Sequence, residues 1–209
     1  MQKIANFLSG TKILEERKSG FNSDIKVVRS LGFGTYIQVN NLTQSGGVVE
    51  DIWKQTLKQI NQLTNQPINS CLILGLGGGT VAKLAKKYWP ESEITGVEID
   101  PVMVELGKKY LGLKSTKIII QDAYEFIKKN KKIYDLVIVD LYVGDEFPNK
   151  FEDEDFLKLL TKNKLVIFNR LYFGEKRKEA VKFGNKLEKI FKKVEWYYPQ
   201  ANLMLFCYN

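Results

Sequence analysis

A cluster of glycines, Gly75 and Gly77–Gly79, follows an apolar run at residues 71–74 and precedes a helix-like segment. Glycine permits the unusual dihedrals of a tight turn and lets a ligand approach the backbone. Glu98 ends the next apolar run, where its carboxylate can accept hydrogen bonds from both hydroxyls of a ribose. The dinucleotide fingerprint GxGxxG requires a further glycine where this chain has Thr80. The pattern therefore predicts a site for a nucleoside without phosphates.

Two further carboxylates stand at the ends of later apolar runs. Asp122 follows KIIIQ and, with the amide of Ala123, could recognise the amino group and ring edge of adenine. Asp140 follows YDLVIV and precedes the loop LYVGDEFP, which would lie over the same cleft. Helix capping is the alternative explanation for Glu98 and Asp122. Because capping does not account for three acids at successive strand ends, we expect one ligand cleft along this edge of the sheet.

The composition removes several classes of chemistry. The chain has no histidine, which excludes Ser-His-Asp and Cys-His catalytic sites and histidine-ligated zinc. Cys71 and Cys207 lie in strand-like segments without CxxC spacing, so we expect reduced core residues and neither a metal site nor a disulfide. No apolar run approaches the roughly 18 residues that a membrane helix needs, and no secretory signal is evident. We expect a cytoplasmic protein that does not enter the membrane.

The net charge of +8 comes mostly from lysines along helix-like segments such as EKRKEAVKFGNKLEKIFKK, residues 175–193. Val181, Leu187, Ile190 and Phe191 mark an apolar face of that helix. Arginines and interleaved aromatic residues are scarce there, which favours a solvated helix face over a nucleic-acid patch. Binding of nucleic acid is left open but is not favoured.

From residue 70 onward, apolar runs alternate with helix-like segments, and the runs are continuous, as in strands buried on both faces. Only PQAN separates the last two runs, which is too short for a parallel crossover, so they must pair as an antiparallel hairpin. We expect an α/β fold with a mostly parallel seven-stranded sheet and this terminal hairpin. The expected strands lie at 71–75, 93–98, 117–121, 135–140, 164–169, 193–198 and 202–208, and the helices near 79–88, 101–111, 123–130, 153–161 and 175–192.

The segment at residues 12–44 alternates polar and apolar residues and is broken at SG, GFG and NN, which predicts a small antiparallel β flap. A helix at residues 48–63 follows and ends at TNQP. We therefore divide the chain into a flap, residues 1–47, and a main domain, residues 48–209. More apolar side chains occur in the flap than one small hairpin needs, which favours a homodimer; they are Phe7, Leu8, Ile13, Leu14, Phe21, Phe33, Tyr36 and Ile37.

Four segments, GLGGGTVAKLAKKYWP, GVEIDPVMVELGKKYLGL, QDAYEFI and YDLVIVDLYVGDEFP, resemble motifs of the spermidine synthase-like branch of the class I S-adenosylmethionine-dependent methyltransferase fold. Upstream, IQVNNLTQSGG is similar to the flap strand of polyamine aminopropyltransferases. The resemblance implies a Rossmann-like fold, with Asp140 in the catalytic position, where it orients or deprotonates an attacking amine. We expect Tyr142 and Asp145 to line the mouth, and we count Tyr142 with Asp140 as a catalytic residue. The donor-binding residues that it implies are Gln44, Gly75, Gly77, Gly78, Glu98, Ile99, Asp122, Ala123 and Asp140.

This sequence departs from the aminopropyltransferase pattern in two places. Those enzymes carry an aspartate in the glycine loop that holds the free amine of the donor, where this chain has Gly78, and a Tyr-His pair after the flap glutamine, where GGVVEDIW has no histidine. Free amides of a glycine loop suit the carboxylate of S-adenosylmethionine. We therefore expect methyl transfer from S-adenosylmethionine to a small-molecule or protein amine, without a metal. Two alternatives are aminopropyl transfer from decarboxylated S-adenosylmethionine and a non-catalytic nucleoside-binding or interaction module.

Overall fold

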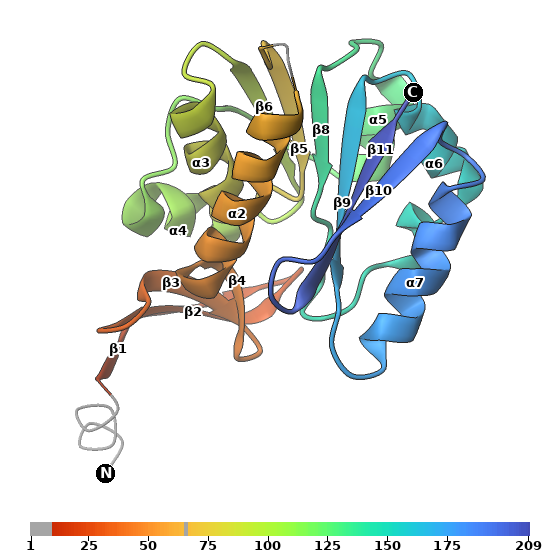
Figure 1. Ribbon diagram of the computed structural model, residues 1–209. Helices are drawn as coiled ribbons and strands as arrows, with labels where there is room; N and C mark the ends of the chain where they lie inside the picture. The colour runs from red at the N-terminus through yellow and green to blue at the C-terminus, as the bar shows by residue number, and fades with distance from the viewer. Residues whose placement is uncertain (1–9, 65–66) are drawn as a thin grey trace.

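The computed structural model describes residues 10–64 and 67–209, which form two β sheets with helices around the larger one (Figure 1). The smaller sheet is an antiparallel meander of β1 (Thr11–Ser19), β2 (Ser23–Ser30), β3 (Gly34–Val39) and β4 (Leu42–Gly46). Alternate side chains of a strand point to the same face, and here one face packs on α4 (Pro101–Leu106). This sheet is the expected β flap.

Seven strands form the larger sheet in the order β10-β11-β9-β8-β5-β6-β7. Their bounds are β5 (Ser70–Leu74), β6 (Glu93–Glu98), β7 (Lys117–Ile120), β8 (Leu136–Val139), β9 (Leu165–Leu171), β10 (Lys193–Tyr197) and β11 (Asn202–Tyr208). β5 to β9 pair in parallel, whereas β11 runs antiparallel to both β9 and β10. The predicted parallel sheet with a terminal hairpin is confirmed.

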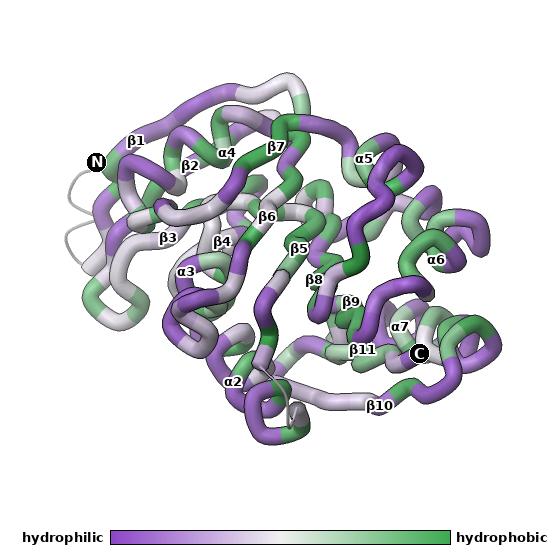
Figure 2. Tube along the Cα trace, turned by 90° about the horizontal axis from the view of Figure 1, so that it is seen from above, coloured by the Kyte–Doolittle hydropathy of each residue, from purple (hydrophilic) through white to green (hydrophobic). Residues whose placement is uncertain are grey.

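Helices cover both faces of this sheet, which explains why its central strands are buried and largely apolar. One face packs on α2 (Gly47–Leu63), α3 (Thr80–Tyr88) and α4, and the other on α5 (Ala123–Lys129), α6 (Glu154–Leu160) and α7 (Lys176–Leu187). Within β5, Cys71 and Ile73 face the first layer, whereas Leu72 and Leu74 face the second. Figure 2 shows these hydrophobic strands at the centre of the molecule and hydrophilic segments at its edge.

Two expected helices differ from the prediction. The segment predicted at 101–111 is α4 followed by a π-helical turn, η1 (Gly107–Leu111), and the segment predicted at 175–192 is helical only to Leu187. Gly107 of η1 lies directly against the backbone of Gly78, where a Cβ would overlap the Gly78 carbonyl. The helix after β6 thus packs closely against the glycine loop.

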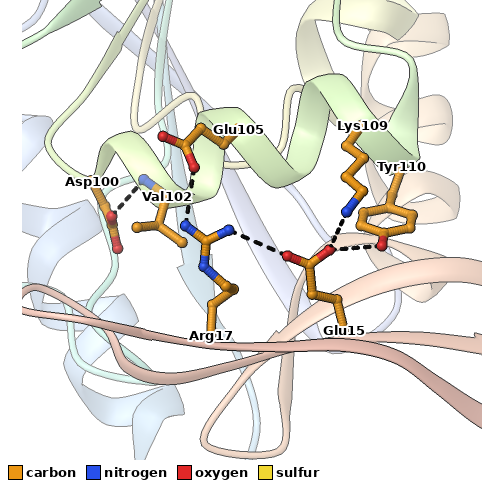
Figure 3. Close-up of polar contacts among 7 residues, drawn as sticks. All are labelled: Glu15, Arg17, Asp100, Val102, Glu105, Lys109 and Tyr110. Carbon is orange, nitrogen blue, oxygen red and sulfur yellow. Dashed lines mark hydrogen bonds and ion pairs between the residues drawn. The ribbon is translucent and has the colours of Figure 1, made fainter.

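Polar contacts hold the flap on α4 and η1 (Figure 3). Glu15 of β1 accepts hydrogen bonds from Lys109 Nζ at 2.6 Å and from the Tyr110 hydroxyl at 2.7 Å. Arg17 donates to Glu15 at 3.2 Å and to Glu105 at 3.1 Å. The bonds from Lys109, Tyr110 and Arg17 lower the pKa of the Glu15 carboxyl to about 2. An ionised Glu15 therefore fixes the flap to the helix that follows β6.

The apolar flap residues that favoured a homodimer divide into three groups. Phe7 and Leu8 lie outside the described residues. Ile37 is buried in the core that the flap shares with α4, and Leu14 and Tyr36 are partly buried, whereas Ile13, Phe21 and Phe33 are exposed. The homodimer stays a prediction.

Candidate active site

A cleft of about 410 Å³ lies along the carboxyl ends of the parallel strands, with the flap and the start of α2 as its other walls. Strand ends of a parallel sheet meet at one edge, which is where such folds bind ligands. We call the part lined by residues 75–77, 98–99 and 121–123 the glycine-loop half. The part lined by Trp53 and by residues within 140–144, 169–173 and 200–202 is the β9 half.

Gly75 joins the two halves. Its φ of +86° lies in the left-handed region that favours glycine, and a Cβ there would overlap the carbonyl of Asp140. The ends of β5 and β8 therefore come into close contact. Gly75 and Gly77 line the cleft, as expected, but Gly78 faces Ile37 of the flap and Leu111 instead.

The backbone amides of the glycine loop are already engaged within the protein. Gly75 and Leu76 donate to Val97 O at 3.0 Å each, Gly77 to Glu98 Oε2 at 2.7 Å, Gly78 to Ser45 Oγ at 2.8 Å and Gly79 to Leu76 O at 3.0 Å. Each N–H is a single donor. From Gly75 to Gly79, no amide is left free for an anionic ligand.

Glu98, at the end of β6, lies in the glycine-loop half with only 8% of its surface exposed. Besides the bond from Gly77, it accepts one from the amide of Asp100 at 3.0 Å. Burial raises the pKa of the Glu98 carboxyl, and these two amides oppose the rise. Asp100, not Glu98, caps α4, so the capping alternative does not apply to Glu98. Its neighbour Ile99 also lines the cleft.

Asp122 does cap a helix, since its Oδ1 accepts from the amides of Tyr124 at 2.9 Å and Glu125 at 3.1 Å at the start of α5. Its Oδ2 lies 2.5 Å from Lys150 Nζ. Partial burial opposes ionisation, but the Lys150 ammonium and the two amides hold the pKa of Asp122 below its usual value. The charge of Asp122 is therefore neutralised by Lys150, and both residues line the cleft together with Ala123.

Asp140 follows β8, which lies between β5 and β9 in the sheet, and it lines the β9 half. Its Oδ1 accepts from Asn169 Nδ2 at 2.8 Å and its Oδ2 from Trp53 Nε1 at 3.1 Å. Asn202 Nδ2 in turn donates to Asn169 Oδ1 at 2.7 Å. Burial raises the pKa of Asp140 to about 6, although the bonds from Asn169 and Trp53 favour the charged form. Asp140 is thus a carboxylate with a fixed orientation and neutral partners.

Residues 50–198 match the family model of the spermine/spermidine synthase domain, which is more than half of the chain. The protein belongs to this family. A polyamine aminopropyltransferase of Clostridioides difficile is 30% identical over 196 residues, which cover 86% of this chain and 68% of that protein. Another, of Sulfurisphaera tokodaii, is 30% identical over 139 residues, 63% of this chain. The alignment spans only 46% of the Sulfurisphaera protein, less than half of its length.

Spermidine synthase from Thermotoga maritima shares the fold, with a TM-score of 0.77 and 17% identity over 94% of this chain and 72% of that one. The expected Rossmann-like fold and the resemblance to the spermidine synthase-like branch are confirmed, and so is the expectation of a transferase family.

The expectation of methyl transfer is wrong. The family model is that of spermine and spermidine synthases, and the curated relatives are named as polyamine aminopropyltransferases. The physical argument for methyl transfer also fails, because it required free amides in the glycine loop. Those amides donate to Val97, Glu98, Ser45 and Leu76, so the loop offers no ready site for the carboxylate of S-adenosylmethionine.

Three other predicted site residues have structural partners in this member of the family. Gln44 Nε2 donates to Gly144 O at 2.9 Å and so closes the flap across the loop after β8. The Tyr142 hydroxyl donates to Asn169 O at 3.1 Å and accepts from the Leu171 amide at 2.9 Å, and burial raises its pKa. Both side chains line the cleft, but Asp145 does not and lies 3.9 Å from Lys176 instead.

Sequence reasoning missed much of the cleft lining, including the hydrogen-bonding or charged side chains of Trp53, Lys150, Asn169 and Asn202. Asn169 carried a usable signal, because it is a polar residue directly after the apolar run of β9, as Glu98, Asp122 and Asp140 are after theirs. Trp53 carried none, since an aromatic residue at helical spacing is normally part of the core.

Neither of the two cysteines lines the cleft. Cys71 and Cys207 are buried and unpaired, and burial raises the pKa of the Cys71 thiol to about 12. Within residues 10–64 and 67–209, no group of three or more His, Cys, Asp or Glu side chains could hold a metal ion. No helix of the same ranges has the length and apolar character needed to cross a membrane.

Proposed function

We propose that this protein transfers the aminopropyl group of decarboxylated S-adenosylmethionine to an amine. The observation that carries the proposal is the engagement of every glycine-loop amide from Gly75 to Gly79. A donor that has lost its carboxylate needs no free amide there, whereas S-adenosylmethionine would leave its carboxylate buried without donors. The names of the curated relatives support the same donor.

In this proposal the glycine-loop half holds the donor. Glu98, with Ile99 beside it, accepts hydrogen bonds from the ribose hydroxyls, and the segment at Asp122 and Ala123 lies against adenine. Gly75 and Gly77 allow the sulfonium arm to pass along the backbone, and Gly78 supports the loop through its contact with the flap. Gln44 holds the flap over the bound donor through its bond to Gly144.

The reaction is a displacement at carbon. The lone pair of the acceptor amine attacks the methylene carbon bonded to the sulfonium, the carbon–sulfur bond breaks, and its electron pair stays on sulfur. Methylthioadenosine leaves, and the proton lost by the new secondary amine passes to Asp140. Such a step depends mainly on the alignment of the two reactants and on one positioned base. The fixed orientation of the Asp140 carboxylate between Asn169 and Trp53 suits both tasks.

The test compares the two donors with the purified protein and a mixture of primary amines. We expect mass spectrometry to detect methylthioadenosine and an amine heavier by one aminopropyl group with the decarboxylated donor, and no methylated product with S-adenosylmethionine. Calorimetry should show tighter binding of the decarboxylated donor. Formation of S-adenosylhomocysteine and a methylated amine would overturn the proposal.

A further inference from the structure

The cleft has few charged side chains. Among the described residues that line it, four are charged: Glu98, Asp122, Asp140 and Lys150. Glu98 and Asp122 lie in the glycine-loop half, where two backbone amides and the Lys150 ammonium engage them. Asp140 is the one carboxylate of the β9 half in the described ranges, and residues 1–9 and 65–66 contain no aspartate or glutamate. This half therefore offers one carboxylate to an ammonium group.

Two acids of the loop after β8 lie outside the cleft. Lys176 at the start of α7 lies 2.6 Å from Glu146 and 3.9 Å from Asp145, and neither acid lines the cleft. These two carboxylates thus pair with α7 and add no charge to the lining of the β9 half.

The remaining lining of the β9 half is neutral and rich in apolar side chains. Val143 is 51% exposed and Phe173 42% exposed, although both line the cleft, and Leu171 lies between Asn169 and Phe173 in the same wall. Val48 of α2 lines the cleft with 38% of its surface exposed. Large apolar side chains that are exposed together in a cleft mark a site that an apolar group of a ligand covers.

We propose that the acceptor is a monoamine, a primary amine whose amino group lies at Asp140 and whose uncharged, apolar tail packs on Leu171, Phe173 and Val143. The inference rests on the proposed aminopropyl transfer and names its acceptor class. A diamine of the same length would bring a second ammonium against these apolar side chains, where it would lose its hydration without gaining a carboxylate. The tail, in contrast, gains from every methylene that it buries.

The test uses two amines of equal length, n-hexylamine and 1,6-diaminohexane, which differ only in the second amino group. Each is titrated by calorimetry into the full chain saturated with methylthioadenosine. We expect n-hexylamine to bind at least tenfold more tightly than the diamine, and n-butylamine to bind about tenfold more weakly than n-hexylamine, because it buries two fewer methylenes. Equal or tighter binding of the diamine, or no binding of either amine, would overturn the inference.

A charge variant makes the test independent of absolute affinity. Phe173→Asp places a carboxylate beside the proposed tail and should reverse the preference in favour of 1,6-diaminohexane. Phe21→Asp is the matched control, because Phe21 is 49% exposed on the flap but does not line the cleft, so the preference should stay as in the wild type. An unchanged preference in a folded Phe173→Asp protein would also overturn the inference.

Turnover separates this inference from the function on which it rests. With the decarboxylated donor, the expected result is aminopropylation of n-hexylamine at a higher kcat/KM than of 1,6-diaminohexane. If the diamine is the better substrate, the acceptor class is wrong and the aminopropyl transfer stands. If no amine is aminopropylated although n-hexylamine binds as expected, the transfer is wrong and the assignment of the apolar subsite stands.

Discussion

The two halves of the cleft are built differently. The glycine-loop half comes from consecutive strand–turn–helix units, in which Gly75, Glu98 and Asp122 each lie at or just after the end of a strand of the parallel sheet. The β9 half brings together Trp53 from a helix, Asn169 from β9 and Asn202 from the antiparallel β11, around Asp140. The hydrogen bonds of this half, including the one from Tyr142 to β9, join residues that are 27 to 87 positions apart in the sequence.

The fold itself determines the glycine-loop half, whereas the β9 half depends on side chains that can differ between members of the family. In the proposed function, the nucleoside lies against groups whose positions follow from the parallel sheet itself, so a related fold supplies them with little change. The proposed acceptor lies against side chains that only the packing of α2, β9 and the terminal hairpin brings together. Substitutions in the two halves should therefore have separable effects: those in the β9 half on turnover and acceptor choice, those in the glycine-loop half on donor affinity.

Asp140→Asn is the strongest test of this separation. The amide cannot take the proton of the attacking amine, so kcat should fall by about 10²–10⁴-fold, the usual contribution of a positioned base. Donor affinity should stay within a few fold, because Asp140 stands outside the glycine-loop half. Steady-state kinetics at saturating donor and calorimetry with methylthioadenosine give the two values, and Asp51→Asn on the exposed side of α2 is the control. Normal turnover would leave Asp140 a structural residue only.

Glu98→Gln probes the other half. Glutamine keeps the shape of the side chain but loses the charge that strengthens its bonds to the ribose hydroxyls, which should weaken donor binding by about 1.5–3 kcal/mol. At saturating donor, kcat should change much less than in Asp140→Asn. Calorimetry with methylthioadenosine measures the affinity, and Glu91→Gln at an exposed position is the control. Equal loss of kcat and affinity would contradict the separation of the two halves.

The same contrast explains what the sequence could predict. The order of strands and helices and the residues Gly75, Glu98, Asp122 and Asp140 were accessible, because buried strands are continuous apolar runs and polar residues after them are conspicuous. Asn169 followed the same rule but was overlooked, because an asparagine suggests no chemistry by itself. Such features depend only on neighbouring residues in the chain, and they can therefore be predicted from the sequence.

Contacts between distant segments were not accessible from the sequence. The bond from Gly78 to Ser45 joins the glycine loop to the flap, and the ion pair of Asp122 with Lys150 joins the start of α5 to the 3-10 helix η2 (Asn149–Phe151). Neither follows from periodicity or from a motif. The engagement of the loop amides was invisible for this reason, and the choice of methyl transfer, which assumed free amides, was wrong.

Asn169→Ala tests the role of the β9 half through the pH dependence of the reaction. Burial raises the pKa of Asp140 to about 6, and the Asn169 bond is one of two that oppose this rise. Removal of that bond makes the charged form less favourable, so the pKa should rise further. Since the reaction needs the charged form, the acid limb of the kcat/KM profile should move to higher pH, with a several-fold loss near pH 6 and a smaller one above pH 8. Asn185→Ala on the exposed side of α7 is the control, and an unshifted acid limb would argue against Asp140 as the base.

Glu15→Gln should have the smallest effect and tests whether the flap contributes to the glycine-loop half. The substitution weakens the contacts of Glu15 with Lys109 and Tyr110, which hold the flap on the helix after β6. Exposed ion pairs are weak and are screened by salt, so donor affinity should fall at most about fivefold at low salt and the difference should vanish at 1 M salt. The folded-state pKa of Glu15 is lowered to about 2, from an unfolded value of 4.5. Its contribution is therefore complete above pH 4.5 and is lost only as pH falls toward 2. The difference in donor affinity between Glu15→Gln and the wild type should thus be equal at pH 6 and pH 8. Glu16→Gln is the control, because the Glu16 carboxylate pairs with Lys26 of the flap at 3.7 Å. An effect that persists in 1 M salt would mean that Glu15 acts on the donor by a route other than its ion pair.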